Sequence, residues 1–196
     1  MCEDKIQLVI ALDSSNAVGS CNWNHMKTFA SRLVSHMRLH QESVTANVIS
    51  FGDSATLEVS SHGYHDLNDL QKLIANSRYH SGSSRIDLAL DLSSRLFENH
   101  KDPDVRKVIL MVTSLSSNSD VKESLLMDRV SRLKESGAEL FMVNIGQANV
   151  NYAATKEKLL DISSKPMHLH TLAPESFAKA VTYGTAGARM VCRNVA

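Results

Sequence analysis

The sequence predicts an α/β fold: a doubly wound, mostly parallel six-stranded sheet with one antiparallel edge strand and helices on both faces. Short, almost continuous apolar runs occur at 6–12, 107–112 and 139–145, and such runs are typical of parallel strands buried on both faces. Segments with apolar residues at helical spacing separate these runs, as in doubly wound sheets. The alternation covers almost all of the 196 residues without a repeat or a linker, so we expect 1–196 to be a single domain.

The first half of the chain contains three of the expected strands. A Gly-Asp-Ser turn at 52–54 separates two short apolar runs and therefore predicts a hairpin, which makes one strand an antiparallel edge. Further on, Ser83 or Ser84 is placed to cap a helix, and Asp87 stands three residues after Ser84, close to a capping box. The expected strands are 6–12, 45–51 and 55–59, and the expected helices are 23–40, 66–75 and 84–97.

The second half continues the alternation to the end of the chain. Gly137 is placed to end one helix, and Pro174 to open the last one. His168 and His170 alternate along a short strand, which we interpret as a solvent-facing pair, since zinc would need further ligands from elsewhere. The expected strands are 107–112, 139–145 and 167–171, and the expected helices are 121–136, 152–163 and 174–191.

Polar residues follow the first strand directly, starting with Asp13, Ser14 and Ser15. In open parallel sheets, ligands bind in the crevice outside the carboxyl ends of the strands, so these side chains stand where a functional site is expected. The alternative is that Asp13 and Ser15 only satisfy backbone groups of the loop. Both interpretations stay open on these residues alone.

The strand followed by Asp13-x-Ser15 resembles the opening of a von Willebrand factor A domain, an integrin I-like domain. The first loop of that family reads Asp-x-Ser-x-Ser and binds a divalent cation that grips an acidic residue of the partner. Ser84, in a Ser/Gly loop before a helix, occupies the position of the family's threonine ligand. The resemblance covers about 5–192 and implies the Rossmann-like fold of these domains, with a metal site at Asp13, Ser15 and Ser84.

Two positions depart from the family's metal motif. Ala17 stands where the third ligand of the first loop, a serine, is expected, and Ser114 replaces the aspartate that usually follows the fourth strand. A hard divalent cation needs about six oxygen ligands and is poorly held without dedicated carboxylates. We therefore expect a vestigial site that binds Mg²⁺ weakly or not at all, and no other cofactor.

The composition excludes several classes of function. Lys plus Arg and Asp plus Glu number 21 each, without a basic stripe, which argues against nucleic acid as a partner. No segment approaches the roughly 20 apolar residues of a membrane span. Dinucleotide, phosphate-loop and nucleophile-elbow motifs are also absent from the sequence, so we expect a protein that is not an enzyme.

Three cysteines bear on the compartment. Cys2 precedes the first strand and Cys192 follows the last helix, so the two would pair if both flank the same edge of the sheet, which implies an oxidising compartment. Cys21 would then be left over, as a buried small residue or as a thiol free for another chain. Three reduced thiols in a cytosolic protein are the alternative.

The end of the chain resembles the matrix type of A domain, in particular collagen VI, through the segment 165–170, Phe177 and an alanine-rich helix that ends in Cys192. This resemblance implies a secreted, non-catalytic module of the extracellular matrix for matrix assembly or cell adhesion. Its partners would be proteins such as matrix components, collagen or a cell-surface receptor, bound without metal. The alternatives are a cell-surface adhesin of the apicomplexan gliding type and an intracellular scaffold.

Overall fold

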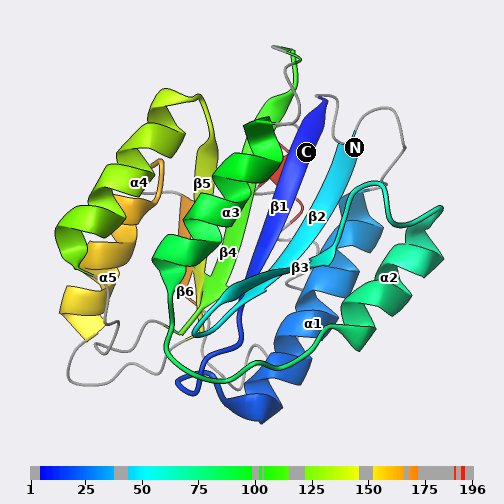
Figure 1. Cartoon of the computed structure of the whole chain (residues 1–196), viewed down its shortest axis with the longest axis horizontal. Coiled ribbons are helices and arrows are strands. Elements are labelled where there is room, and N and C mark those ends of the chain that lie inside the picture. Colours follow the sequence, from blue (N-terminus) through cyan, green and yellow to red (C-terminus); the bar gives the residue numbers. More distant parts are fainter. Residues whose placement is uncertain are drawn as a thin grey trace.

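A computed structural model describes the chain over residues 5–37, 44–98, 102, 104–114, 122–145, 152–165, 168–171, 188, 191 and 192. Six strands form one sheet in the order β3-β2-β1-β4-β5-β6, with β1 and β4 at its centre (Figure 1). The strands are β1 (Ile6–Asp13), β2 (Val44–Phe51), β3 (Ala55–Val59), β4 (Arg106–Thr113), β5 (Glu139–Asn144) and β6 (Leu169–Thr171). The helices are α1 (Gly19–Met37), α2 (Leu67–Asn76), α3 (Ile86–Glu98), α4 (Glu123–Glu135) and α5 (Tyr152–Ile162).

The pairing of the strands confirms the predicted fold class. Every neighbouring pair is parallel except β2 and β3, which form the antiparallel hairpin expected from the turn at 52–54. β3 therefore lies at the edge of the sheet. The central strand β1 is buried along its whole length because both of its faces are covered, whereas β3 is largely exposed or half-buried.

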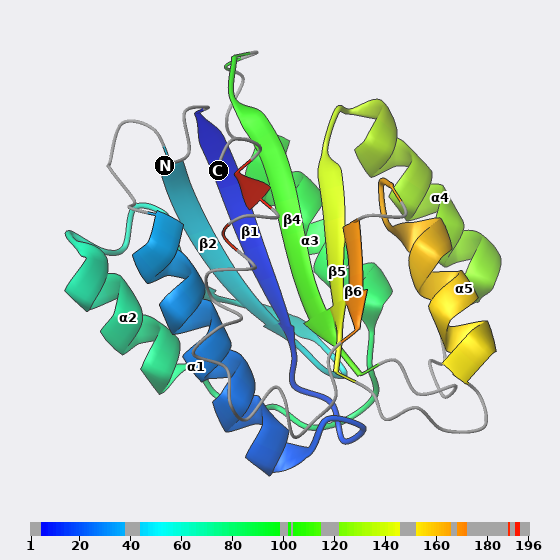
Figure 2. The same ribbon diagram turned by 180° about the vertical axis from the view of Figure 1, so that it is seen from behind.

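Helices cover both faces of the sheet and create two cores. In β1, Leu8, Ile10 and Leu12 belong to the core beneath α1 and α2, whereas Val9 and Ala11 point into the core beneath α3, α4 and α5. Figures 1 and 2 show these two layers from opposite sides. This alternation is the two-residue period of a strand, and it explains why a continuous apolar run is needed at the centre.

Two predictions about single elements are corrected by the structure. α1 begins at Gly19, before the expected Trp23, because the polar segment after β1 closes into a tight turn and the helix starts at once. His168 is not part of a solvent-facing pair: its ring is buried and stacks on Phe141, with 3.9 Å between the ring centroids. Only His170 of the two is exposed.

The predicted terminal helix, 174–191, lies almost entirely outside the described residues. Ala188, Val191 and Cys192 are described, and all three are buried in the core beneath α1. Of the helices in the described part of the chain, none is both long and apolar enough to cross a bilayer.

Candidate metal-ion site

The carboxylate of Asp13 is the centre of the polar cluster at the carboxyl end of β1. The residue is fully buried. Its Oδ2 accepts hydrogen bonds from the hydroxyls of Ser84, at 2.8 Å, and Thr113, at 2.6 Å. Its Oδ1 accepts one from the backbone N–H of Ser15, at 2.9 Å. Three segments of the chain, β1, the loop before α3 and the end of β4, therefore meet at one carboxylate.

Thr113 joins the cluster because of the register of the sheet. β1 and β4 are parallel neighbours with Leu12 beside Val112, so the next residues, Asp13 and Thr113, also lie side by side. Thr113 is not among the site residues that the sequence predicts. A hydroxyl at the last position of a buried strand would indicate this role, provided that β4 is known to lie next to β1.

The loop after β1 is closed by its own backbone. The N–H groups of Val18 and Gly19 donate to the carbonyl of Ser15, at 3.1 and 3.3 Å, and the Tyr79 hydroxyl donates to the same oxygen, at 3.1 Å. The side-chain oxygen of Ser15 is buried but makes no hydrogen bond within the described part of the chain. The Ser15 hydroxyl is therefore a buried polar group whose hydrogen bond a water molecule or an ion could supply.

The loop that carries Ser84 is held by close backbone contacts. The N–H of Ser83 donates to Oδ1 of Asp53, at 2.7 Å, and the carbonyl of Gly82 accepts from Asn16, at 2.9 Å. Gly82 has φ of +86°, and a Cβ there would lie 2.3 Å from the Asp53 carboxyl carbon. Only glycine fits this position, and the fit fixes Ser84 against Asp13.

Ser84 and Asp87, the two side chains of the expected capping box, have other partners in the structure. The Ser84 hydroxyl donates to Asp13, and the Asp87 carboxylate accepts two hydrogen bonds from the Arg85 guanidinium, both at 2.8 Å. Arg129 of α4 lies 3.8 Å from the same carboxylate. Burial raises the pKa of Asp87, but Arg85 and Arg129 together outweigh it and hold this pKa below its ordinary value.

The structure brings three of the five expected metal positions together, namely Asp13, Ser15 and Ser84. At the other two, Ala17 offers only an exposed methyl group and Ser114 a half-buried hydroxyl. Among these positions Asp13 is the one carboxylate, and it already accepts three hydrogen bonds. The described residues contain no group of three or more His, Cys, Asp or Glu able to hold a metal. These positions therefore offer hydroxyls and one carboxylate, fewer charged oxygens than a hard divalent cation usually takes.

The structure describes two of the three cysteines, Cys21 and Cys192. Cys21, in the first turn of α1, is exposed and has a free thiol, so it is not the buried small residue that was one of its two interpretations. Cys192 is buried, with 2% of its surface exposed. Cys2 lies outside the described residues, so its pairing with Cys192 stays a prediction.

The chain is similar to known proteins along most of its length. The family model of the von Willebrand factor type A domain matches residues 7–183. The human Collagen alpha-6(VI) chain is 25% identical over 166 residues, which are 84% of this chain and 7% of that protein. Mouse Matrilin-2 is 22% identical over 182 residues, or 90% of this chain and 18% of that protein. The chain thus spans a small part of these two relatives.

Solved structures of proximal thread matrix protein 1 from the mussel byssus share the fold. One crystal form has a TM-score of 0.82 at 20% sequence identity, over 97% of this chain and 49% of that one. Another, described as having a zinc-occupied MIDAS motif, has a TM-score of 0.81, also at 20% identity. At this level of identity the likeness concerns the fold alone.

Proposed function

Since the chain belongs to the von Willebrand factor type A domain family, whose model matches residues 7–183, we propose that it is a non-catalytic module for protein interaction in the extracellular matrix. The observation that carries the proposal is the similarity over 84% of the chain to a collagen VI chain, together with that to Matrilin-2. The module takes part in matrix assembly or cell adhesion. Its partners are proteins, such as other matrix components, collagen or a cell-surface receptor.

The module binds these partners without a divalent cation. A metal-dependent A domain presents an incompletely coordinated cation to a partner's acidic residue, and such a cation needs enough protein oxygens to stay bound. Here Ala17 supplies none, and Ser114 supplies a neutral hydroxyl instead of a carboxylate. The hydroxyls of Ser84 and Thr113 donate to Asp13, so the cluster is held together by hydrogen bonds within the protein. The site would bind Mg²⁺ weakly at most.

The same cluster supports a non-catalytic role. A serine nucleophile needs a base within hydrogen-bond reach. Within the described residues, the Ser84 hydroxyl donates to a carboxylate that already has two other donors, Ser14 donates to the carbonyl of Phe51, and Ser15 has no side-chain partner. In this part of the chain, none of these hydroxyls makes a hydrogen bond to a histidine. The polar cluster therefore has the organisation of a structural centre rather than that of a hydrolase.

We propose that the protein lies outside the cell, in the secreted matrix. The predicted Cys2–Cys192 disulfide is part of this assignment, because such a bond persists in oxidising compartments. An intracellular scaffold of the same fold would keep all its thiols reduced. The two cases are therefore separable by counting thiols.

The experiment that tests the function is capture of partners from a matrix extract on the immobilised chain, in buffer with Mg²⁺ and in buffer with a chelator. We expect the same matrix proteins to be captured in both buffers. The variant Ala17→Ser/Ser114→Asp is the matched comparison, since it restores the ligand positions without changing the rest of the surface. Capture that disappears from the unmodified chain with chelator would contradict metal independence, and capture of no matrix protein would contradict the function.

A further inference from the structure

Arg106 is the first residue of β4 and lies where the parallel strands begin, at the edge of the sheet opposite Asp13. Its guanidinium contacts two other segments of the chain. Nε donates to Oε1 of Glu139, the first residue of β5, at 3.0 Å, and Nη2 lies 2.9 Å from the same oxygen. Nη1 donates to the carbonyl of Val191, at 3.2 Å. One side chain thus joins β4, β5 and the last residues that the structure describes.

These last residues are Ala188, Val191 and Cys192, which we call the Val191 turn. The N–H of Cys192 donates to the carbonyl of Ala188, at 2.9 Å, as in a helix. All three residues are buried in the core beneath α1, and Cys192 is 2% exposed. Figure 2 shows the turn, in red, beside β1 and β4. Cys192 is therefore shielded from solvent as long as the turn stays in place.

The carbonyl of Val191 is at the end of this helical turn, where carbonyl groups have no partner within the helix. A guanidinium satisfies such a carbonyl with a charge-assisted hydrogen bond, which is stronger than a bond between neutral groups. The side chains of Arg106 and Glu139 are only 15% and 16% exposed, so the loss of either partner would leave a poorly solvated charge. Glu139 therefore holds the guanidinium in the position from which it binds the turn.

We propose that Arg106 and Glu139 form a latch that sets how often the Val191 turn leaves the sheet, and thereby how fast Cys192 reacts with a thiol reagent or with another thiol. Proteins open locally at a lower cost in free energy than that of global unfolding, and a buried cysteine reacts only in such open states. The hydrogen bond from Arg106 must break before the turn can leave, because the guanidinium belongs to β4 and the carbonyl to the turn.

The latch is separate from the proposed binding of matrix proteins, so its test needs no partner. The test is the rate at which iodoacetamide alkylates Cys192 in the folded chain with all thiols reduced, followed by mass spectrometry of the peptides. Reduction ensures that this rate reports the opening of the latch and not the breaking of a disulfide. Cys21 is the internal standard, because its thiol is free and exposed and needs no opening to react.

In the unmodified chain we expect Cys192 to react much more slowly than Cys21. Arg106→Met removes the donor to the Val191 carbonyl and should raise the rate of Cys192 about tenfold or more. The rate of Cys21 should stay unchanged, since Cys21 lies in the first turn of α1, at the opposite edge of the sheet.

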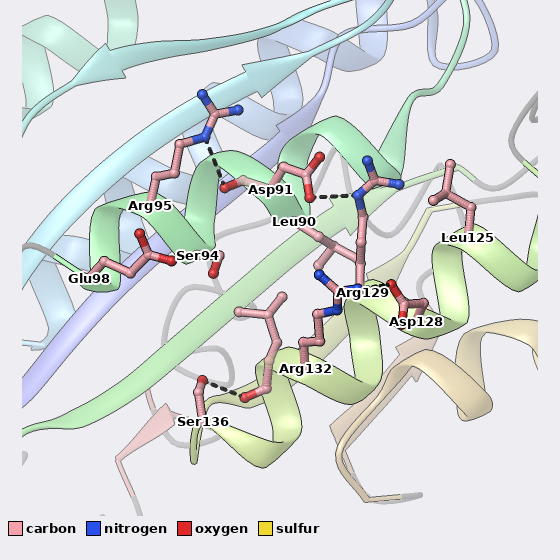
Figure 3. Close-up of a pocket in the computed structure, with 11 residues that line it drawn as sticks. Leu90, Asp91, Ser94, Arg95, Glu98, Leu125, Asp128, Arg129, Arg132 and Ser136 are labelled. Atoms are coloured by element: carbon pink, nitrogen blue, oxygen red, sulfur yellow. Dashed lines mark hydrogen bonds and ion pairs between the residues drawn. The ribbon is translucent and has the colours of Figure 1, made fainter.

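Arg95→Met is the matched control. It removes an exposed guanidinium of α3 that also donates to a carbonyl, that of Asp91, at 3.4 Å (Figure 3). This variant should leave both alkylation rates unchanged. Glu139→Gln should raise the rate of Cys192, since the Arg106 guanidinium loses its anchor. Arg106→Met/Glu139→Gln should raise that rate no further than Arg106→Met, because the two side chains act as one unit.

Hydrogen exchange of the β1 amides in the same variants separates opening of the latch from a loss of global stability. A latch requires that Arg106→Met raises the alkylation rate of Cys192 more than the exchange rate of β1. Equal increases would overturn the proposal, because the guanidinium would then only stabilise the whole fold. Alkylation of Cys192 that is as fast as that of Cys21 in the unmodified chain, or that Arg106→Met leaves unchanged, would overturn it too.

Discussion

At the scale of single residues, Asp13 decides how the carboxyl edge of the sheet is organised. Its carboxyl group is buried, and three donors at 2.6 to 2.9 Å compensate for the lost water. Hydrogen bonds to an ionised group are stronger than those between neutral groups, and a buried donor left unsatisfied is costly. Asp13 therefore has a structural role whether or not an ion visits the site.

The substitution Asp13→Asn tests this role. An amide has one acceptor oxygen and one donor NH₂ group, so at least one of the three donors would face another donor. We expect the free energy of unfolding to fall by about 2 kcal/mol or more. Chemical denaturation of the variant checks the loss, and Glu98→Gln, which changes an exposed carboxylate, is the control that should leave stability unchanged. A neutral Asp13→Asn would contradict the structural role.

Metal binding gives a second prediction at this scale. The melting temperature of the unmodified chain should be the same in millimolar Mg²⁺ and in chelator, because ligand binding to the native state alone must stabilise it. Ala17→Ser/Ser114→Asp restores the family's ligand pattern, so its melting temperature should rise with Mg²⁺. A metal-dependent shift in the unmodified chain would contradict the first expectation. A double variant indifferent to metal would show that the loops are aligned wrongly with the family.

At the scale of elements, an ion-pair network joins the start of α3 to α4. Asp87 is fully buried between Arg85 of the preceding loop and Arg129 of α4, and Arg129 also binds Asp91 one turn further along α3. Hydrogen bonding and charge from Asp91 help to raise the pKa of Arg129, against the opposing effect of burial. The network fixes the two helices relative to each other.

The network predicts a specific dependence on pH. Because the pKa of Asp87 in the folded protein lies below its ordinary value, its ionisation stabilises the fold above about pH 4, and this contribution disappears as pH falls through the folded-state pKa. Asp87→Asn should therefore cost about 1–3 kcal/mol at neutral pH, and less below about pH 4. Urea unfolding of both proteins at several pH values measures the difference.

The control for this experiment is Asp128→Asn. Its partner Arg132 is 76% exposed, so the cost should stay below about 1 kcal/mol at every pH. A difference between the unmodified chain and Asp87→Asn that persists unchanged into acid would contradict the assignment to a charged Asp87.

At the scale of the whole molecule, local patterns predicted the architecture well and side-chain partners poorly. Apolar runs fixed the central strands, and the turn at 52–54 predicted the hairpin, because both signals are local. Thr113 was missed because its role depends on which strand lies beside β1. The local pattern around Ser84 indicates a helix cap, and only the family resemblance placed this residue at one site with Asp13, 71 positions away. His168 was misplaced because stacking on Phe141 also depends on tertiary structure.

The disulfide is a prediction about the whole chain. Alkylation in denaturant without reductant should label one thiol, that of Cys21, and full reduction should expose three. In the chain-entropy model a bond that closes nearly the entire chain contributes at most about 5 kcal/mol, so reduction should lower the melting temperature clearly. Mass spectrometry counts the labels. Three labels without reductant would contradict both the pairing and the secreted location.

Because three distant segments meet at Asp13, local unfolding at this edge of the sheet should be cooperative. The donors to its Oδ2 are 71 and 100 positions away in the chain. If one loop unfolded alone, it would break a hydrogen bond to Asp13 and leave a buried donor or the carboxylate without its partner. The N–H of Ser15, although it belongs to a loop, should therefore take up deuterium as slowly as the central strands. In this part of the molecule the loops and the sheet would form one cooperative unit of hydrogen exchange.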